Sequence, residues 1–268
     1  MSKISILGCG WLGLPLAKSL LEKKHELKTS TTSPEKMEKL ENLGLNPYLI
    51  SVSKNGIEGN IFNFLEDSEI LIIDIPPKIG TNEKEDFTAK IRSLILEIEK
   101  SSVEKVLFVS ATSVYDDDEN FRIITEETPE NPETKSGKQL LESERLLLAN
   151  TNFKTTSLRF GGLYGEERHP IKYLSGRNGI ANPDAPINLI GLNDCIGIIE
   201  KIIEKEAWNQ VFNGVNPQHP SRKEYYNGKA LSLGLPLVGF DESKVSVGKI
   251  IDSGKVVSVL VHDFASQI

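Results

Sequence analysis

The chain has 268 residues, 38% of them hydrophobic and 26% charged, and a formal net charge of −7. This composition is typical of a globular protein with a sizeable core, and the acidic balance speaks against a general nucleic-acid binder, because neutralising phosphates needs a basic surface. Two cysteines are too few for a disulfide framework and favour a reducing compartment. No apolar run is long enough for a signal peptide or a membrane span, so we expect a cytoplasmic protein without membrane contact.

Apolar runs and helical periodicity alternate along the first half of the chain. Helices are predicted over 11–24, from Ser33 (with Pro34 at its first position) and over 83–100, and strands over 3–7, 25–31, 46–51, 68–77 and 105–111. The runs ILIIDI and VLFVSA are almost continuously apolar, as parallel strands covered on both faces are. The alternation predicts an α/β fold with a Rossmann-like, doubly wound parallel sheet, whose ligands bind beyond the carboxyl ends of the strands.

The second half of the chain is less regular. Residues 115–135 are polar and acidic without clear periodicity, and we expect this stretch to be the least ordered. After a helix over 137–149 and a strand over 154–160, the pattern predicts a helix from Asp194, a strand over 211–215 and a helix with a capping box. We therefore predict a dinucleotide-binding Rossmann domain over 1–160 and a smaller C-terminal substrate lobe over 161–268.

A glycine-rich turn links the first strand to the first helix. The segment GCGWLG places Gly8, Gly10 and Gly13 in G-x-G-x-x-G spacing, which suits a tight turn, close approach to a diphosphate and close helix packing, in that order. The helix N-terminus attracts the diphosphate. We predict that Gly8 to Gly13 bind it, with Cys9 within the turn. The side chains of Trp11 and Leu12 suit packing, while their backbone N–H groups can bind phosphate. A purely structural turn remains the alternative.

The end of the second predicted strand indicates which dinucleotide binds. It reads Thr31, Thr32, Ser33, without the carboxylate that holds the ribose 2′-hydroxyl of NAD. Hydroxyls, a helix N-terminus and a nearby Lys28 or Lys36 can accept a 2′-phosphate, so the sequence favours NADP over NAD. The alternative is that these three residues only begin a helix.

Two later strand ends complete the predicted cofactor site. Ile75 and Pro76 lie at the end of the fourth strand, where the backbone of such folds passes the dinucleotide, although the prolines could simply end the strand. Ser110 ends the fifth strand.

The chain resembles the extended short-chain dehydrogenase/reductase family, which includes NAD(P)-dependent epimerases and dehydratases. The resemblance spans nearly the whole chain and rests on the segments GCGWLG, VSATSVY, SGKQLLESE, LRFGGLYG and INLIGLNDC. It implies a Rossmann domain with a C-terminal substrate lobe and a small polar or nucleotide-linked substrate. It also implies a homodimer through the helices over 83–100 and 137–149.

The positions that carry the family's proton-transfer chemistry are substituted. Counting from VSATSVY, the family's Ser/Thr position is Ala111, its tyrosine position is Ser136 and its lysine position is Leu140. A serine hydroxyl is a much weaker acid than a phenol, and leucine has no charge to lower its pKa. Thr112, Ser113 and Ser136 are therefore the candidate catalytic residues, and the alternative is that Thr112 and Ser113 only shape the turn.

Two functions follow from an intact cofactor turn beside a substituted proton-transfer site. The first is an atypical NADP-dependent oxidoreductase or epimerase with a non-standard proton donor. The second is a noncatalytic NADP(H)-binding sensor or scaffold. The only Y-x-x-x-K sequence, Tyr225 with Lys229, lies far along the chain and fits a chance occurrence. The four histidines are scattered singly, so we expect no metal site.

Overall fold

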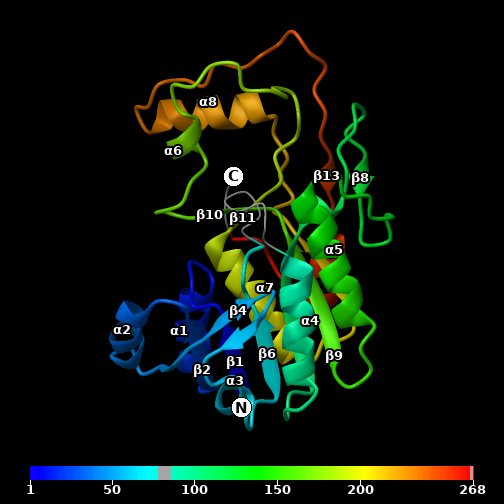
Figure 1. Cartoon of the computed structure of the whole chain (residues 1–268). Helices are drawn as coiled ribbons and strands as arrows, with labels where there is room; N and C mark the ends of the chain where they lie inside the picture. The colour runs from blue at the N-terminus through cyan, green and yellow to red at the C-terminus, as the bar shows by residue number, and fades with distance from the viewer. Residues whose placement is uncertain (78–85, 266–267) are drawn as a thin grey trace.

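A parallel sheet of seven strands forms the centre of the molecule (Figure 1). The computed structural model describes residues 1–77, 86–265 and 268. The strand order is β12-β9-β7-β6-β1-β2-β3, and all six pairings are parallel. The strands are β1 (Lys3–Leu7), β2 (Glu26–Thr31), β3 (Asn46–Leu49), β6 (Ile70–Ile73), β7 (Lys105–Ala111), β9 (Lys154–Phe160) and β12 (Val211–Gly214). The order changes direction between β1 and β6, so the switch point lies beside the glycine-rich turn. The doubly wound α/β fold is confirmed.

Helices cover both faces of the sheet. The side chains of successive strand residues lie alternately in two separate hydrophobic cores, one on each face. Ile70 and Ile72 pack into the first core, beneath α1 (Gly13–Glu22), α7 (Leu192–Glu204) and the π-helical turn η3 (Val256–Leu260). Leu71 and Ile73 pack into the second, beneath α3 (Ile61–Leu65), α4 (Phe87–Ile98) and α5 (Lys135–Leu148). Burial on both sides explains the continuous apolar runs of β6 and β7.

A third, smaller core lies beyond the sheet. It packs α6 (Ile171–Leu174) against α8 (Arg222–Ser232), and both helices stand apart from the sheet at the top of Figure 1. Ser221 and Glu224 form the predicted capping box. The short pair β10 (Gly162–Tyr164) and β11 (Leu189–Gly191) lies between this lobe and the sheet. However, β12 and α7, which also follow residue 160, belong with the large sheet, so the segment 161–268 contributes to both parts.

Several expected elements differ in detail from the structure. The helix expected from Ser33 is a 3-10 turn, η1 (Pro34–Lys36), followed by α2 (Met37–Glu41), and the Ser33 hydroxyl donates to Glu35 instead of capping the helix. A hairpin of β4 (Ser51–Ser53) and β5 (Gly56–Glu58) was not predicted. Residues 83–85 of the helix predicted over 83–100 lie outside the described residues.

The acidic stretch over 115–135 contains more regular structure than its sequence predicts. It begins after the 3-10 turn η2 (Thr112–Val114) and contains β8 (Ile123–Ile124), which pairs with β13 (Ile250–Ile251) near the C-terminus. Among the described residues, no helix is both long and apolar enough to cross a membrane.

Candidate functional site

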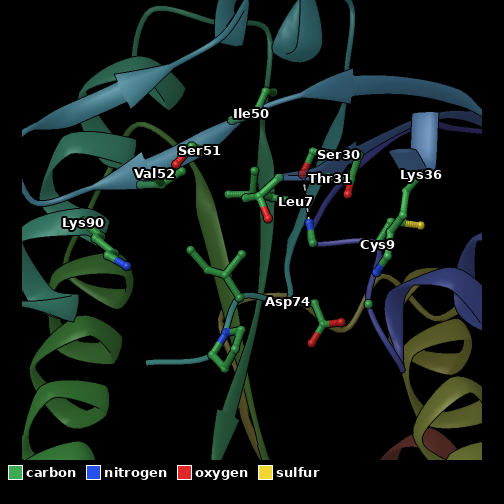
Figure 2. A pocket seen from close by; sticks show the side chains of 15 residues that line it. Leu7, Cys9, Ser30, Thr31, Lys36, Ile50, Ser51, Val52, Asp74 and Lys90 are labelled. Carbon is green, nitrogen blue, oxygen red and sulfur yellow. Dashed lines mark hydrogen bonds between the residues drawn. The ribbon is translucent and has the colours of Figure 1, made fainter. Parts of the chain in front are cut away.

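A cavity of about 370 Å³ opens at the carboxyl ends of β1, β2 and β6, beside the switch point (Figure 2). Four segments and one residue of α4 line it: Leu7–Gly10, Ser30–Thr32 with Lys36, Ile50–Val52, Asp74–Pro76, and Lys90. Chain segments that are far apart in the sequence thus meet where ligands of doubly wound sheets bind.

Different features of the structure explain why glycine occupies each of the three positions in the turn. Gly8 has φ +112°, and a Cβ on it would lie 2.2 Å from the carbonyl oxygen of Asp74. A Cβ on Gly13 would lie 2.1 Å from the carbonyl oxygen of Gly8, so α1 packs tightly on the turn. By contrast, no atom of the described residues lies within 4 Å of the Cβ position of Gly10, which lines the cavity. Packing thus explains the first and third glycines, and the second fits the approach of a ligand.

The N-terminus of α1 faces the cavity end at Gly10. Its N-cap residue, Leu12, makes no side-chain cap and its first turn contains no acidic residue, although the Gly13 N–H bonds to the carboxyl group of Asp74. Together with the open space at Gly10, this fits the diphosphate of a dinucleotide, because unpaired helix N–H groups and the helix dipole favour a negative charge there.

Asp74 places a carboxyl group at the same point. Burial raises the pKa of Asp74 to about 7, while the backbone N–H of Gly13 and the charge of Arg168 act in the opposite direction. Burial likewise raises the pKa of the neighbouring Cys9 thiol to about 11. Cys9 is therefore a protonated packing residue of the turn and not a nucleophile.

The end of the cavity at β2 is lined by hydroxyl groups and a cation. The Ser30 hydroxyl accepts a hydrogen bond of 3.0 Å from the Gly8 N–H, which ties β2 to the glycine-rich turn. Thr31 and Thr32 line the cavity together with Lys36. Among the described residues, no carboxylate lines this end, which matches the sequence-based expectation for a 2′-phosphate.

The predicted cofactor residues fall into two groups. Those that line the cavity together are Gly8, Cys9, Gly10, Thr31, Thr32, Ile75 and Pro76. Those outside its lining are Trp11, Leu12, Gly13, Ser33 and Ser110. Leu12 is buried in the first core, Trp11 packs partly buried against that core, and the Ser110 hydroxyl donates to Glu144. Their roles in cofactor binding remain predictions.

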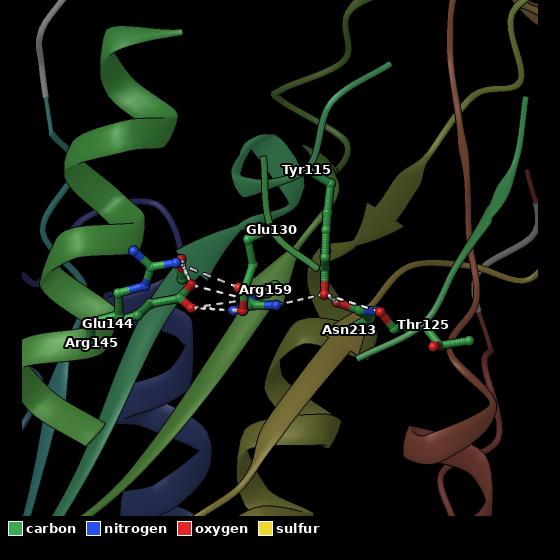
Figure 3. Close-up of polar contacts among 8 residues, drawn as sticks. Tyr115, Thr125, Glu130, Glu144, Arg145, Arg159 and Asn213 are labelled. Carbon is green, nitrogen blue, oxygen red and sulfur yellow. Dashed lines mark hydrogen bonds and ion pairs between the residues drawn. The ribbon is translucent and has the colours of Figure 1, made fainter. Parts of the chain in front are cut away.

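A buried polar network lies at the carboxyl ends of β7, β9 and β12 (Figure 3). Arg159 and Glu144 are each 1% exposed, and the Arg159 guanidinium donates to both Glu144 oxygens, with Nη2 2.6 Å from Oε2. The same guanidinium donates to Glu130 at 2.7 Å and to the Tyr115 hydroxyl at 2.6 Å. Burial by itself lowers the pKa of Arg159, but its bonds to Glu144 outweigh burial and raise it, so the cation is permanent.

This network explains the order of the acidic stretch. Tyr115 and Glu130 both belong to the stretch, and Arg159 ties them to the sheet, while Glu126 accepts a hydrogen bond of 2.7 Å from the Asn213 N–H. The sequence analysis missed the network. The available signals were an arginine between Leu158 and Phe160 in a predicted strand and a glutamate on the apolar face of α5.

The candidate catalytic residues meet where η2 contacts the N-terminus of α5. A Cβ on Gly137 would lie 2.2 Å from the carbonyl oxygen of Ser113, so Ser136, the preceding residue, is held close to η2. Leu140 is 4% exposed and packs in the second core, so the family's lysine position is apolar and closed to solvent. Thr112, Ser113 and Ser136 do not line the described cavity.

The Tyr225–Lys229 sequence has a structural explanation. Tyr225 lies buried in the small lobe, where its hydroxyl is 3.0 Å from Nε2 of His169. Burial raises the pKa of Tyr225, and Lys229 does not offset it. A catalytic tyrosine needs the opposite shift, so this pair fits packing and not proton transfer.

The comparisons with known proteins agree with this geometry. No protein-family model matches the chain. Protein YeeZ of Escherichia coli strain K12 is 31% identical to it, and the match covers 98% of the chain and 96% of YeeZ. The chain belongs to the YeeZ family. The family assignment fixes no reaction.

Solved structures show the fold of this YeeZ-family chain. MoeE5 in complex with UDP-glucuronic acid and NAD superposes with a TM-score of 0.82 at 18% identity, over 99% of this chain and 94% of MoeE5. UDP-glucuronic acid 4-epimerase from Bacillus cereus in complex with NAD gives 0.80 at 16% identity, over 99% and 92%. A short-chain dehydrogenase/reductase superfamily protein from Agrobacterium tumefaciens with bound NAD gives 0.79 at 15%, over 99% and 93%. The resemblance seen in the sequence motifs is therefore confirmed at the level of the fold.

Proposed function

We propose that the chain binds a nicotinamide dinucleotide in the cavity at the switch point, with NADP(H) preferred over NAD(H). The observation that carries this proposal is the space that the described residues leave open in front of Gly10, at the N-terminus of α1. The backbone of Gly8 to Gly13 would hold the diphosphate. NAD in the structures of MoeE5 and the Bacillus cereus epimerase supports the cofactor class.

The preference for NADP(H) rests on the β2 end of the cavity. Thr31, Thr32 and Lys36 offer hydroxyl donors and one positive charge to a 2′-phosphate. A carboxylate at this place would repel that phosphate, and among the described lining residues none is present there.

The leading candidate activity is an oxidoreductase or epimerase on a small polar or nucleotide-linked substrate. When bound, the nicotinamide supplies hydride transfer. Thr112, Ser113 and Ser136 are the hydroxyl groups available near the family's tyrosine position to orient a substrate oxygen or pass a proton. UDP-glucuronic acid in MoeE5 supports the nucleotide-linked class.

A noncatalytic NADP(H)-binding sensor or scaffold is the second candidate. It is favoured by the burial of Leu140, because an apolar core residue in place of the lysine leaves no cation near Ser136 on that helical face. Both candidates use the same cofactor cavity and differ only in the proton-transfer step.

The assembly and location of the protein complete the proposal. We propose a homodimer through α4 and α5, where Leu96 is 57% exposed and a second cavity of about 500 Å³ is lined by Ile95 and Leu146. The lobe that contains α6 and α8 would select the substrate, with 1–160 as the dinucleotide-binding part. Two buried free cysteines support a cytoplasmic location.

Calorimetric titration tests the cofactor. NADPH should bind at least tenfold more tightly than NADH. Gly10→Val should abolish binding because its side chain fills the space for the diphosphate. Gly228→Val in α8 is the matched control, since no atom of the described part of the chain lies within 4 Å of the Gly228 Cβ position either. Binding of neither dinucleotide would remove the proposal, and binding unaffected by Gly10→Val would move the cofactor to another site.

Turnover separates the two candidate functions. NADPH oxidation is measured over a panel of carbonyl compounds, and epimer formation over a panel of sugar nucleotides because an epimerase regenerates its cofactor without net oxidation, with Thr112→Ala, Ser113→Ala and Ser136→Ala as variants. Turnover that falls in at least one variant supports the enzyme and assigns the hydroxyl. NADPH binding without turnover over the whole panel supports the noncatalytic protein.

A further inference from the structure

The turn that follows β10 lies against the glycine-rich turn, although the two are more than 150 residues apart in the sequence. Gly165 and Arg168 exchange backbone hydrogen bonds of 2.7 and 3.2 Å, which closes a tight turn. A Cβ on Gly165 would lie 3.0 Å from Cζ2 of Trp11. The second half of the chain therefore contacts the centre of the G-x-G-x-x-G segment.

Arg168 presents its charge at this contact. Its Cζ lies 5.1 Å from the centre of the Trp11 ring, an arrangement that fixes the guanidinium plane while the N–H edges stay available. Within the described ranges, no carboxylate lies within 4.0 Å of this side chain, which is exposed. Arg168 thus has a defined position and spare hydrogen-bond donors.

The charges around the cavity indicate a role for Arg168. Asp74 lines the cavity next to Gly13, and a carboxylate there would repel a diphosphate. Arg168 is close enough to Asp74 to lower the pKa of its carboxyl group. The lysines of the cavity, Lys36 and Lys90, come from η1 and α4 and lie apart from Asp74 in Figure 2.

We propose that Arg168 binds the diphosphate of the dinucleotide directly, so that the cofactor is held between the glycine-rich turn and the turn after β10. This inference rests on the proposed dinucleotide binding. It assigns to the second half of the chain a binding residue that the G-x-G-x-x-G pattern does not contain. A bidentate guanidinium suits a diphosphate better than an ammonium group does.

NADPH titration of Arg168→Gln and Arg168→Lys tests the inference, with Arg177→Gln as the matched control. Arg177 is another exposed arginine of the same half, and of the two only Arg168 packs over the Trp11 ring and lowers the pKa of Asp74. We expect Arg168→Gln to weaken NADPH about tenfold or more, as loss of charge-assisted hydrogen bonds does. Arg168→Lys should lose less affinity for NADPH, and Arg177→Gln should bind NADPH as tightly as the unmodified protein. Thermal midpoints of all variants show that they are folded.

A second background separates direct binding from an effect through Asp74. If Arg168 contacts the diphosphate, Arg168→Gln weakens NADPH as strongly in Asp74→Asn as in the unmodified protein. An effect that disappears in Asp74→Asn would show that Arg168 only neutralises the carboxylate, and would overturn the inference. Unchanged affinity in Arg168→Gln, or an equal loss in Arg177→Gln, would overturn it as well. If the unmodified protein binds no NADPH, the proposed function itself fails.

Discussion

Replacing Arg159 by methionine should strongly destabilise the protein, because Arg159 is, among the described residues, the cation that pairs with the buried carboxylate of Glu144. Glu144 is 1% exposed and would keep the Ser110 hydroxyl as its one remaining side-chain partner. Glu130 has a side chain 27% exposed and can be hydrated instead. Most of the loss of stability should therefore come from the unpaired carboxylate of Glu144.

The expected magnitude follows from this burial. Breaking a buried ion pair by removing one partner costs about 3–5 kcal/mol. For a chain of this size, 1 kcal/mol lowers the melting temperature by roughly 2–4 °C. Arg159→Met should therefore lower it by roughly 10 °C. Arg159→Met/Glu144→Met removes both charges and should recover most of this loss, apart from about 1 kcal/mol for the Ser110 hydroxyl that loses its acceptor.

Thermal unfolding followed by circular dichroism measures both effects. The matched control is Arg145→Met, because Arg145 is 3.8 Å from the same Glu130 but has a side chain 62% exposed. An exposed pair contributes about 0–1 kcal/mol, so this variant should melt within a few degrees of the unmodified protein. If Arg159→Met melts no lower than Arg145→Met, or the double variant melts no higher than Arg159→Met, the buried network does not anchor the fold as described.

Three further predictions concern the cofactor cavity, a helix end and the proposed dimer. Asp74 has a folded pKa of about 7, above its ordinary 3.8, so its contribution to stability is lost as the pH rises through that interval. Relative to the unmodified protein without ligand, Asp74→Asn should therefore have a higher urea midpoint at about pH 8 and no advantage at about pH 4. Ser221→Ala breaks the capping box of α8 and should cost about 1 kcal/mol in urea unfolding, whereas Ser232→Ala at the other end of the helix should cost less. Leu96→Asp should convert a dimer to a monomer in sedimentation experiments, whereas Phe62→Asp, at an equally exposed position on α3, should leave the dimer intact.

The sheet could be predicted from the sequence because each strand carries its own signal. β7 and β9 were predicted at their observed bounds, and the apolar run of β7 is what a parallel strand buried on both faces needs. The signal for the glycine-rich turn also lies within one short segment, because a tight turn, an approach to a ligand and a helix contact all fall within six residues. Asn55-Gly56 was an available hairpin signal for β4 and β5 that the analysis did not use.

The missed parts depend on contacts between distant residues. Arg159 lies in a predicted strand and Glu144 on the apolar face of a predicted helix, but nothing in either segment shows that the two side chains meet. The contact of Arg168 with Trp11 joins residues that only the complete fold brings together. The helix expected from Ser33 differs in a local way instead: it begins as a 3-10 turn, and the Ser33 hydroxyl bonds to Glu35 and not to a backbone N–H group.

The most direct test of dinucleotide binding at the glycine-rich turn uses the fluorescence of Trp11. The chain has two tryptophans, and Trp208→Phe leaves Trp11, which lies within the turn, as the single reporter. Titration of this variant with NADPH should quench the Trp11 emission in a saturable way, with energy transfer to the reduced nicotinamide. Trp11 emission that stays constant while calorimetry records NADPH binding would place the cofactor elsewhere and contradict the account.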